Sequence, residues 1–269
     1  MSEPEQEECK SVVGRASARD YIQSIERGFA VLLAFDEHLP QPSLSELSAK
    51  TGLSRPAVRR ILLTLERLGY VEQRPGRWAL TPRVLSIGQH YTATHALTEL
   101  AKPHLLTIME QTQESASLAV LDGADVVYVA RVQVRRIMSI HVDVGARVAA
   151  HATGMGHTLM SEHSPRELRH RLGEGPFQRF TPHTIVDMET LQQRLSQVRT
   201  QGYALADSEL EVGLLSVSVP VRDRTGKVVA TLASSSSVGR TDIETMRHQV
   251  LPLLQEQATL LNRTLRHTT

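Results

Sequence analysis

The chain has 269 residues, of which 41% are hydrophobic and 22% are charged. This balance is enough for a packed core and excludes a disordered chain or a small disulfide-stabilised scaffold. The single cysteine, Cys9, excludes an intramolecular disulfide and indicates a reducing, cytoplasmic setting. No apolar run approaches the roughly 18 residues of a membrane span, so we expect no membrane partner. The formal net charge of +1 does not decide on nucleic acid, because attraction depends on where charges lie.

The first expected helix follows a polar leader. Residues 1–18 lack apolar periodicity, which predicts a segment without packed structure. Beyond them, apolar side chains recur at helical spacing, and we expect a helix that buries this face and ends before His38. The four side chains of the face are Ile22, Ile25, Phe29 and Leu33.

Two further helices are predicted with only a short turn between them. Ser43 and Glu46 have the spacing of a capping box, which starts the first helix, and Gly52 is suited to end it. Ser54 and Pro56 mark the start of the next helix, with serine as its cap. The apolar stripe of that helix consists of Val58, Ile61, Leu62, Leu65 and Leu68. A helix, a glycine turn and a second helix with a basic start are typical of a helix-turn-helix.

A hairpin and a linker helix are predicted next. Two short strands at 70–73 and 77–80 enclose the turn residues Arg74-Pro75-Gly76, and this hairpin would be the wing. Thr81-Pro82 then starts a helix that reaches about residue 95. We therefore predict a flexible leader, a winged helix-turn-helix domain, a linker helix and a second domain, with the boundaries 1–18, 19–81, 82–96 and 97–269.

The second domain alternates helices and strands without an internal repeat. Helices are predicted around Leu105 and near 155–162, 165–171, 188–201 and 242–265. Strands are predicted at 115–121, 126–132, 137–144, 203–206, 214–221 and 228–235. This mixture favours an α+β fold in which helices cover one face of an antiparallel sheet.

Basic residues are concentrated in the first domain. Residues 51–83 contain seven arginines and two glutamates, a formal charge of +5 that the net charge of the chain conceals. Arginine binds guanine edges and phosphates in bidentate fashion and enters narrow minor grooves, so we expect double-stranded operator DNA as a partner. The expected contacts are Ser54, Arg55, Ala57, Arg59 and Arg60 on the helix and Arg74 and Arg77 on the wing. The alternative is that these arginines only form the solvated face of a helical bundle.

A glycine-containing loop in the second domain is a candidate anion site. Thr153-Gly154-Met155-Gly156 precedes a predicted helix, and backbone N–H groups that converge at the positive end of a helix suit a carboxylate. The alternative is a plain loop that leads into a helix. Ser235 and Ser237 share one face of the last strand by alternation. Ile140 and Val148 are candidates for an apolar ligand wall or for ordinary core.

Many segments resemble the IclR family of bacterial transcription regulators, from Asp20 to about Leu265. They include SLSELSAKTGLSRPAVRRILLTLERLGYVE, TPRVLSIG, AVLDGADVVYVARV, HATGMGHTL and SVSVPVRDRTGKVVATL. The segments DYIQSIERGFAVLLAF, YVARVQVRRIMSI and VGARVAAHATGMG are most similar to the branch that regulates protocatechuate and 4-hydroxybenzoate breakdown, the β-ketoadipate pathway.

The resemblance implies a winged helix-turn-helix, a linker helix and a GAF-like antiparallel-sheet domain that binds a small organic acid, without a cofactor. It also implies a dimer or tetramer, with RNA polymerase as a further candidate partner. The implied effector site consists of Gly154, Met155, Asp207, Ser216 and Ser235. An acid near Asp207 would repel an anionic ligand, so we expect the carboxylate at the Gly154-Met155 end.

Two positions depart from the family pattern and leave the effector open. Ala233 stands where relatives have a serine, and His157 stands where many have a lysine. The effector is expected to be of the protocatechuate, 4-hydroxybenzoate or β-ketoadipate class. The alternative is an unrelated small acid such as glyoxylate or pyruvate.

Three other classes of function are alternatives to this one. No nucleophile-elbow, His-Glu-x-x-His or Walker-type motif occurs, so we do not expect an enzyme. A metal-dependent effector domain is an alternative, but the histidine spacings match no compact ligand motif, so we predict no metal site. The histidines in question are His141, His151, His157, His163, His170 and His183. The third alternative is a second domain that serves only for assembly.

Overall fold

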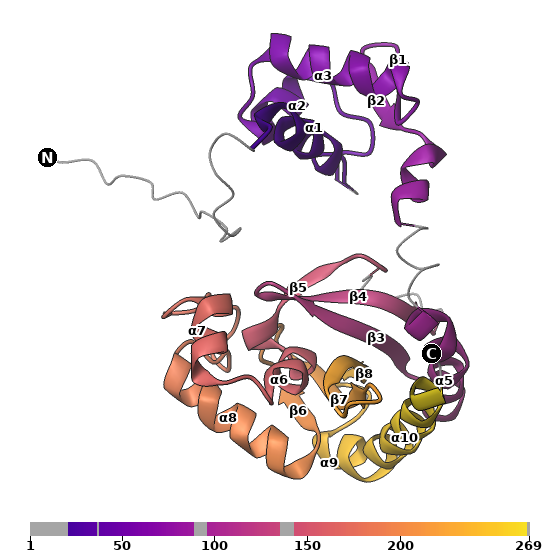
Figure 1. The fold of residues 1–269 in the computed structure, drawn as a ribbon, viewed down its shortest axis with the longest axis vertical. Helices are drawn as coiled ribbons and strands as arrows, with labels where there is room; N and C mark the ends of the chain where they lie inside the picture. The colour runs from indigo at the N-terminus through magenta and orange to yellow at the C-terminus, as the bar shows by residue number, and fades with distance from the viewer. Residues whose placement is uncertain (1–20, 37, 89–95, 135–142, 268–269) are drawn as a thin grey trace, which may run out of the picture. The chain divides into compact units, whose positions relative to one another are not determined.

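The computed structural model describes residues 21–36, 38–88, 96–134 and 143–267 (Figure 1). The chain divides into two compact units, residues 1–91 and 92–269, and each unit is described by itself. Within the described ranges, no helix is both long and apolar enough to cross a membrane.

Three helices form most of the first unit. They are α1 (Gln23–Leu33), α2 (Leu44–Thr51) and α3 (Arg55–Arg67). At the start of α2, the Ser43 hydroxyl accepts from the Glu46 N–H at 3.3 Å, and the Glu46 carboxylate accepts from the Ser43 N–H at 2.7 Å. Gly52 follows α2 with a left-handed φ of 69°, which ends the helix and turns the chain into α3. The predicted helix-turn-helix is therefore confirmed in the capping box of α2 and in its turn.

The wing and the start of the linker follow α3. β1 (Val71–Arg74) and β2 (Arg77–Leu80) pair antiparallel around a two-residue turn, in which Gly76 has a φ of 70°. A short 3₁₀-helix over Pro82–Val84 continues as helix through residue 88. The rest of the predicted linker helix lies outside the described residues.

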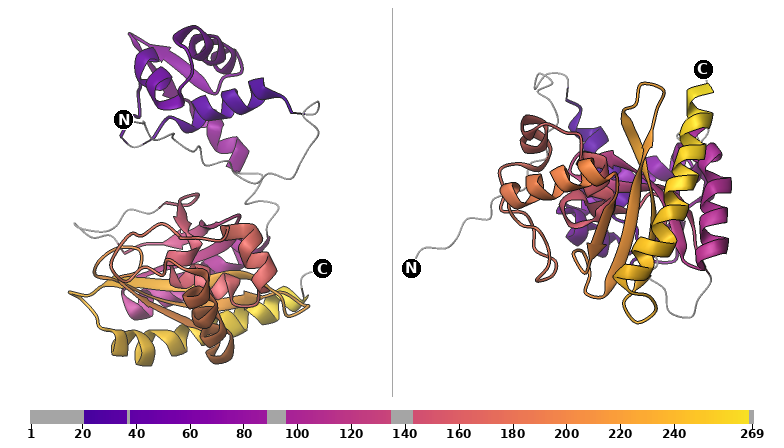
Figure 2. Two further views of the ribbon diagram at one scale, coloured as in Figure 1. Left: turned by 90° about the vertical axis from the view of Figure 1, so that its left-hand side faces the viewer. Right: turned by 90° about the horizontal axis from the view of Figure 1, so that it is seen from below.

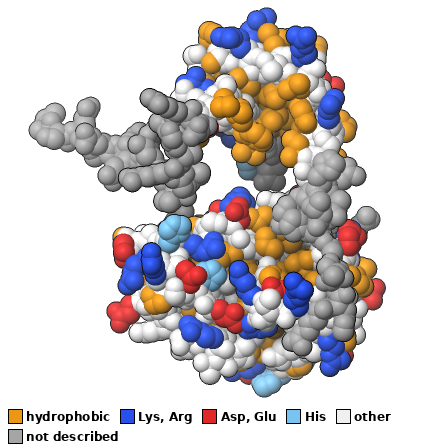
Figure 3. Space-filling view, viewed as in Figure 1, with side chains coloured by type: hydrophobic (Ala, Val, Ile, Leu, Met, Phe, Trp, Pro, Cys, Tyr) orange, Lys and Arg blue, Asp and Glu red, His pale blue; other side chains and the backbone are white. Residues whose placement is uncertain are grey.

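The core of the first unit does not contain the α1 face that the sequence predicted to be buried. Val31, Ala34 and Phe35 pack into the core instead, beside residues of α2, α3 and β2. The expected face is exposed: Ile22 by 59%, Ile25 by 54%, Phe29 by 52% and Leu33 by 77%. The prediction was wrong because apolar spacing identifies a face of a helix but not what covers it. Figure 3 shows hydrophobic side chains gathered over α1.

The second unit is built on one antiparallel sheet of six strands in the order β5-β4-β3-β8-β7-β6. The strands are β3 (Ser115–Asp122), β4 (Asp125–Val132), β5 (Arg147–Ala149), β6 (Ala204–Asp207), β7 (Leu214–Arg222) and β8 (Val228–Ser237). The sequence predicted five of these strands and did not predict β5. Most of the strand predicted at 137–144 lies outside the described residues.

Helices cover both faces of this sheet (Figure 2). One layer contains α5 (Ala96–Thr112) and α10 (Leu251–His267), and α10 is preceded by α9 (Ile243–Thr245) and a π-helical turn over Met246–Val250. The other layer contains α6 (Gly154–Met160), α7 (Pro165–Leu172) and α8 (Met188–Gln201).

The sequence predicted helices on one face only, and the burial of neighbouring strand residues explains the second layer. Leu118 and Leu232 belong to the core under α5 and α10, whereas Ala119 and Ala233 belong to the core under α6. Consecutive residues of a strand point to opposite faces, so both faces of β3 and β8 are apolar and need a cover.

Candidate functional sites

The predicted DNA-contacting residues lie in different places on the first unit. Arg55 and Arg59 are one helical turn apart near the N-terminal end of α3, exposed and without a salt-bridge partner among the described residues. Ser54 precedes them; its hydroxyl makes no capping hydrogen bond, contrary to the capping role predicted for it. Ala57 and Arg60 border a groove between α3 and α1 instead. Figure 3 shows Lys and Arg side chains on this unit over α3.

The two wing arginines make exposed polar contacts. Nη2 of Arg74 lies 2.6 Å from a carboxylate oxygen of Glu72. Nη1 of Arg77 lies 3.5 Å from a carboxylate oxygen of Glu46 and donates to the Gln41 carbonyl at 2.7 Å. Exposed ion pairs of this kind contribute about 1 kcal/mol or less, so DNA phosphates can replace these partners at little cost.

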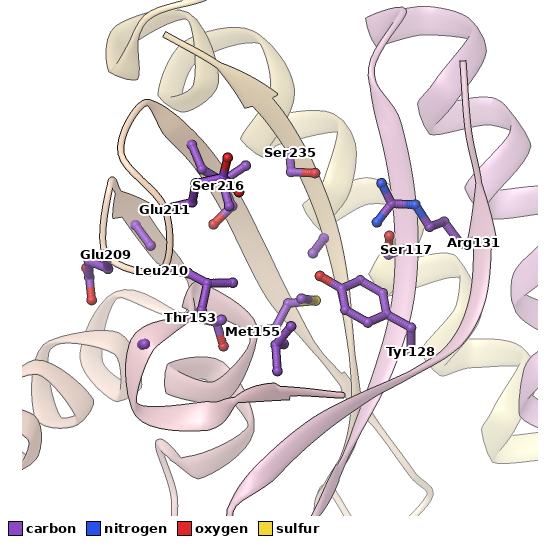
Figure 4. Close-up of a pocket in the computed structure, with 15 residues that line it drawn as sticks. Ser117, Tyr128, Arg131, Thr153, Met155, Glu209, Leu210, Glu211, Ser216 and Ser235 are labelled. Atoms are coloured by element: carbon purple, nitrogen blue, oxygen red, sulfur yellow. The ribbon is translucent and has the colours of Figure 1, made fainter. Parts of the chain in front are cut away.

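A cavity opens in the second unit between the sheet and α6 (Figure 4). Its empty space measures about 700 Å³ including the part open to solvent, and the centre of a water molecule can occupy about 80 Å³ of it. All six strands of the sheet, the turn and helix start at 152–155 and the loop between β6 and β7 contribute to its wall. The lining residues are Ser117, Tyr128, Arg131, Val148, Ala152, Thr153, Met155, Ala206, Glu209, Leu210, Glu211, Leu214, Ser216, Ala233 and Ser235.

Four of the seven predicted effector residues line this cavity: Met155, Val148, Ser216 and Ser235. Ser216 and Ser235 are direct partners across β7 and β8, so their side chains lie on the same face of the sheet. Gly154 is buried just behind the wall, where an added Cβ would lie 3.3 Å from the hydroxyl oxygens of Ser216 and Ser218. Ile140 lies outside the described residues.

Asp207 requires a correction, because the structure does not bring it to this cavity. Its side chain is exposed and lines a separate depression that also contains Arg194 and Tyr203. The neighbouring residue Ala206 pairs with Ser216 and lines the cavity in its place. The difference of one residue matters because side chains alternate between the two faces of a strand.

Tyr128 and Arg131 are cavity residues that the sequence did not indicate, because a β-bulge in β4 brings them to one face. Ala119 pairs with Tyr128 and Ser117 pairs with Arg131, so two residues of β4 lie opposite one residue of β3. Without the bulge, strand alternation would point Tyr128 and Arg131 to opposite faces.

The positively charged end of the cavity is formed by Arg131. Its Nε atom is buried and has no hydrogen-bond partner in the described part of the chain. Its guanidinium carbon lies 5.6 Å from the centroid of the Tyr128 ring. Burial lowers the pKa of Arg131 from its ordinary value, and Tyr128 and Asp143 offset this effect only in part. Burial also raises the pKa of Tyr128, so its hydroxyl stays protonated and can donate a hydrogen bond.

A buried polar cluster supports the β6–β7 loop. A carboxylate oxygen of Glu209 lies 2.7 Å from Nη1 of Arg194, and the other lies 3.7 Å from Nε2 of His157. Nε2 of His157 also lies 2.8 Å from the His151 carbonyl oxygen, which can only accept, so Nε2 carries the proton. Burial lowers the pKa of His157, and the Glu209 carboxylate offsets this only in part. Among the described residues, no three His, Cys, Asp or Glu side chains are grouped as a metal site.

We expect His157→Gln to make the stability of the protein less dependent on pH below pH 6.5. The buried imidazole resists protonation in the folded state, whereas the unfolded chain takes up a proton near the ordinary pKa of 6.5. The unfolded state therefore binds more protons as the pH falls, and the folded state loses stability. One such proton accounts for at most about 1.4 kcal/mol per pH unit.

Urea unfolding of the wild type and of H157Q between pH 7 and pH 5 measures this effect. Replacing the exposed His248 by glutamine is the control and is expected to keep the wild-type pH dependence. An H157Q protein with the full wild-type dependence would show that another group takes up the proton.

The fold and the cavity together define a class of protein. One unit is a winged helix-turn-helix whose Arg55 and Arg59, near the start of α3, are exposed and have no salt-bridge partner within the described ranges. The other unit has a cavity with an apolar lining and a few polar side chains, as ligand sites have. These are the two parts of a ligand-responsive DNA-binding regulator.

Comparison with known proteins agrees with this class. Residues 89–263 match the family described as bacterial transcriptional regulator IclR C-terminal, and residues 24–75 match the IclR helix-turn-helix domain. The chain therefore belongs to the IclR family of bacterial transcriptional regulators. It is 38% identical to the Pca regulon regulatory protein of Pseudomonas putida. That alignment spans 236 residues and covers 87% of this chain and 81% of that protein. The family and branch that the sequence resembles are thus confirmed.

Two solved structures are also similar. A transcriptional regulator from Rhodococcus sp. RHA1 has a TM-score of 0.81 and 40% identity, over 91% of this chain and 98% of that one. The inducer-binding domain of the PobR transcription factor from Acinetobacter, a double mutant in complex with 3-hydroxybenzoic acid, has a TM-score of 0.58 and 32% identity. That alignment covers 61% of this chain and 97% of the domain. The predicted α+β fold class with its GAF-like second domain is confirmed.

Proposed function

We propose that this regulator changes its affinity for operator DNA when a hydroxylated aromatic acid occupies the cavity of the second unit. The observation that carries the proposal is the combination, in one cavity, of apolar walls with a half-buried arginine whose Nε is buried. Arg131 supplies one positive charge, and Met155, Leu210 and Leu214 supply apolar surface. A planar apolar ring with one carboxylate fits this combination, and serine hydroxyls supply partners for ring hydroxyls.

The similar proteins support the aromatic class. PobR, one of them, is described in complex with 3-hydroxybenzoic acid, and another is named for the Pca regulon. Glyoxylate or pyruvate is the alternative effector; either acid would meet Arg131 but would leave the apolar wall without contact. The proposal gives the cavity a binding role and not a catalytic one.

The first unit is proposed to bind the operator through α3 and the wing. Ser54, Arg55 and Arg59 would enter the major groove, and Arg74 and Arg77 would contact phosphates or the minor groove. We keep the domain assignment 19–81 for DNA binding, 82–96 for the linker and 97–269 for the effector domain. A chromosomal operator as the target supports a cytoplasmic location for the protein. Contact with RNA polymerase stays a prediction.

A binding experiment tests the effector proposal. Fluorescence anisotropy with operator DNA, located by footprinting upstream of its own and neighbouring genes, would be measured with and without each acid. We expect 4-hydroxybenzoate or 3,4-dihydroxybenzoate to change the operator Kd by about fivefold or more, a usual size for allosteric coupling. Glyoxylate and pyruvate at the same concentration should not. An effect of glyoxylate or pyruvate alone would reject the aromatic class.

Self-association is proposed to bury the exposed face of α1. Four large apolar side chains, three on α1 and one at its N-cap, are more than half exposed, and a second copy would bring an identical apolar surface to them. Phe29 lies in the middle of that face and is 52% exposed.

We expect Phe29→Glu to shift the protein toward a smaller oligomer, because a carboxylate in the middle of an apolar interface would be buried without a partner. Sedimentation velocity of the full chain measures the oligomeric state. Ala49→Glu, an exposed position on α2, is the control and should leave the oligomer unchanged. An F29E protein with the same mass as the wild type would place the interface elsewhere.

A further inference from the structure

The cavity of the second unit carries opposite charges at its two ends. Arg131 lies at one end, on β4, next to Ser117 across the β3–β4 pair. Glu209 and Glu211 lie at the other end, in the loop between β6 and β7. Figure 4 shows the two ends on opposite sides of Met155 and the Tyr128 ring. An anionic ligand that enters this cavity is therefore oriented by the field between its ends.

We propose that Arg131 binds the carboxylate of the effector and thereby fixes its orientation. The aromatic ring would then lie along Met155 and Leu210, with its hydroxyl group toward the acidic loop. This inference rests on the proposed function and names a residue that determines specificity within it. It reverses the orientation predicted from the sequence, in which the carboxylate lay at Gly154 and Met155.

The buried Nε of Arg131 is the main argument for this orientation. An N–H that is buried without a partner costs free energy, and Arg131 has no salt bridge within the described ranges that would offset the cost. A carboxylate that enters the cavity supplies that partner, and the planar guanidinium matches two carboxylate oxygens. The Ser117 hydroxyl, on the strand residue paired with Arg131, can donate to the same carboxylate.

The other positions are less suited to a carboxylate. At the acidic end, the side chains of Glu209 and Glu211 would repel it, and the cation Arg194 is already paired with Glu209. At the start of α6, the Thr153 hydroxyl accepts from the Gly156 N–H at 3.1 Å. Gly154 packs closely on Ser216 and Ser218, so protein atoms fill this side of the helix start.

Isothermal titration calorimetry on the full chain tests the inference with two matched probes, 4-hydroxybenzoate and its neutral amide, 4-hydroxybenzamide. We expect the wild type to bind the acid at least about 30-fold more tightly than the amide, as for a charge-assisted bidentate contact. Arg131→Gln should bind acid and amide with nearly equal, weak affinity. Arg131→Lys should keep part of the preference, because lysine retains the charge but not the planar fork.

Arg147→Gln is the control, because Arg147 is an exposed arginine on β5 that pairs with Asp122 and Asp125 outside the cavity. It should keep the wild-type preference. Circular dichroism verifies the fold of each variant. If R131Q does not fold, R131K tests the inference alone. A purely structural role of Arg131 would leave the ratio of acid affinity to amide affinity in R131K equal to that of the wild type.

The outcomes separate this inference from the proposed function. Acid binding by the wild type with an unchanged acid-to-amide ratio in R131Q or R131K would overturn the orientation and leave the proposed function intact. A wild type that binds neither 4-hydroxybenzoate nor 3,4-dihydroxybenzoate would reject the proposed function, and the orientation with it.

Discussion

Replacing Arg55 and Arg59 together by alanine is expected to weaken operator binding by about 100-fold or more. Both side chains are exposed near the N-terminal end of α3, and neither has a salt-bridge partner among the described residues. A bidentate arginine contact to a guanine discriminates by about 1–3 kcal/mol, and each lost phosphate contact lowers the salt dependence of binding by about 1. Fluorescence anisotropy with operator DNA at several salt concentrations measures both effects.

A matched double variant separates position from net charge. Lys102→Ala with Arg147→Ala removes the same charge from exposed positions of the second unit and should leave operator affinity nearly unchanged. Equal weakening by both double variants would mean that only overall charge matters. Unchanged binding in the Arg55 and Arg59 variant would show that α3 does not enter the groove.

The first unit could be predicted from the sequence because its signals are local. Ser43 and Glu46 are three residues apart and form the capping box that their spacing indicated. Gly52 and Gly76 take the positive φ angles that their turns need, where residues with a Cβ would be strained. Each of these features depends only on nearby residues, so no knowledge of the tertiary structure was needed.

The cavity could be predicted only in part, because it depends on strand pairing. Ser216 and Ser235 were identified through the family resemblance, and their pairing across β7 and β8 places both in the wall. Arg131 reaches the cavity through a bulge that no residue type in β4 signals, since bulges depend on how two strands pair. Strand geometry also explains why Asp207, predicted as an effector residue, lies outside the cavity and Ala206 lines it. A shift of one residue along a strand moves a side chain to the other face of the sheet.

The exposed face of α1 shows a different limit. Ile25 and Phe29 were correctly placed on one apolar face, yet the core of the unit forms on the face that contains Val31. The spacing of apolar residues in a sequence predicts that a helix has an apolar face. It does not predict whether the same chain or a second copy covers that face. Which of these covers the apolar face of α1 depends on the oligomeric state of the protein.

Gly156→Ala is expected to destabilise the second unit by about 3 kcal/mol or more, the upper end of the usual cost of overpacking that shifts the backbone. An added Cβ would lie 2.5 Å from the Cα and the carbonyl carbon of Ala150, and closer still to its carbonyl oxygen. These are backbone atoms of the 3₁₀ turn before α6, which no side-chain rotation can move away. Chemical denaturation followed by circular dichroism measures the loss.

Alanine substitutions at two other glycines are controls for the stability loss expected of Gly156→Ala. An added Cβ at Gly154 would lie 3.3 Å from the hydroxyl oxygens of Ser216 and Ser218, which can rotate, so Gly154→Ala should cost only about 1 kcal/mol. Gly239 has no atom within 4 Å of an added Cβ, and Gly239→Ala should change stability least. If G156A were as stable as G239A, the turn before α6 would be free to shift. The sequence explained Gly156 by an anion site, whereas the structure explains it by the close approach of Ala150, which holds α6 and therefore Met155 against the cavity.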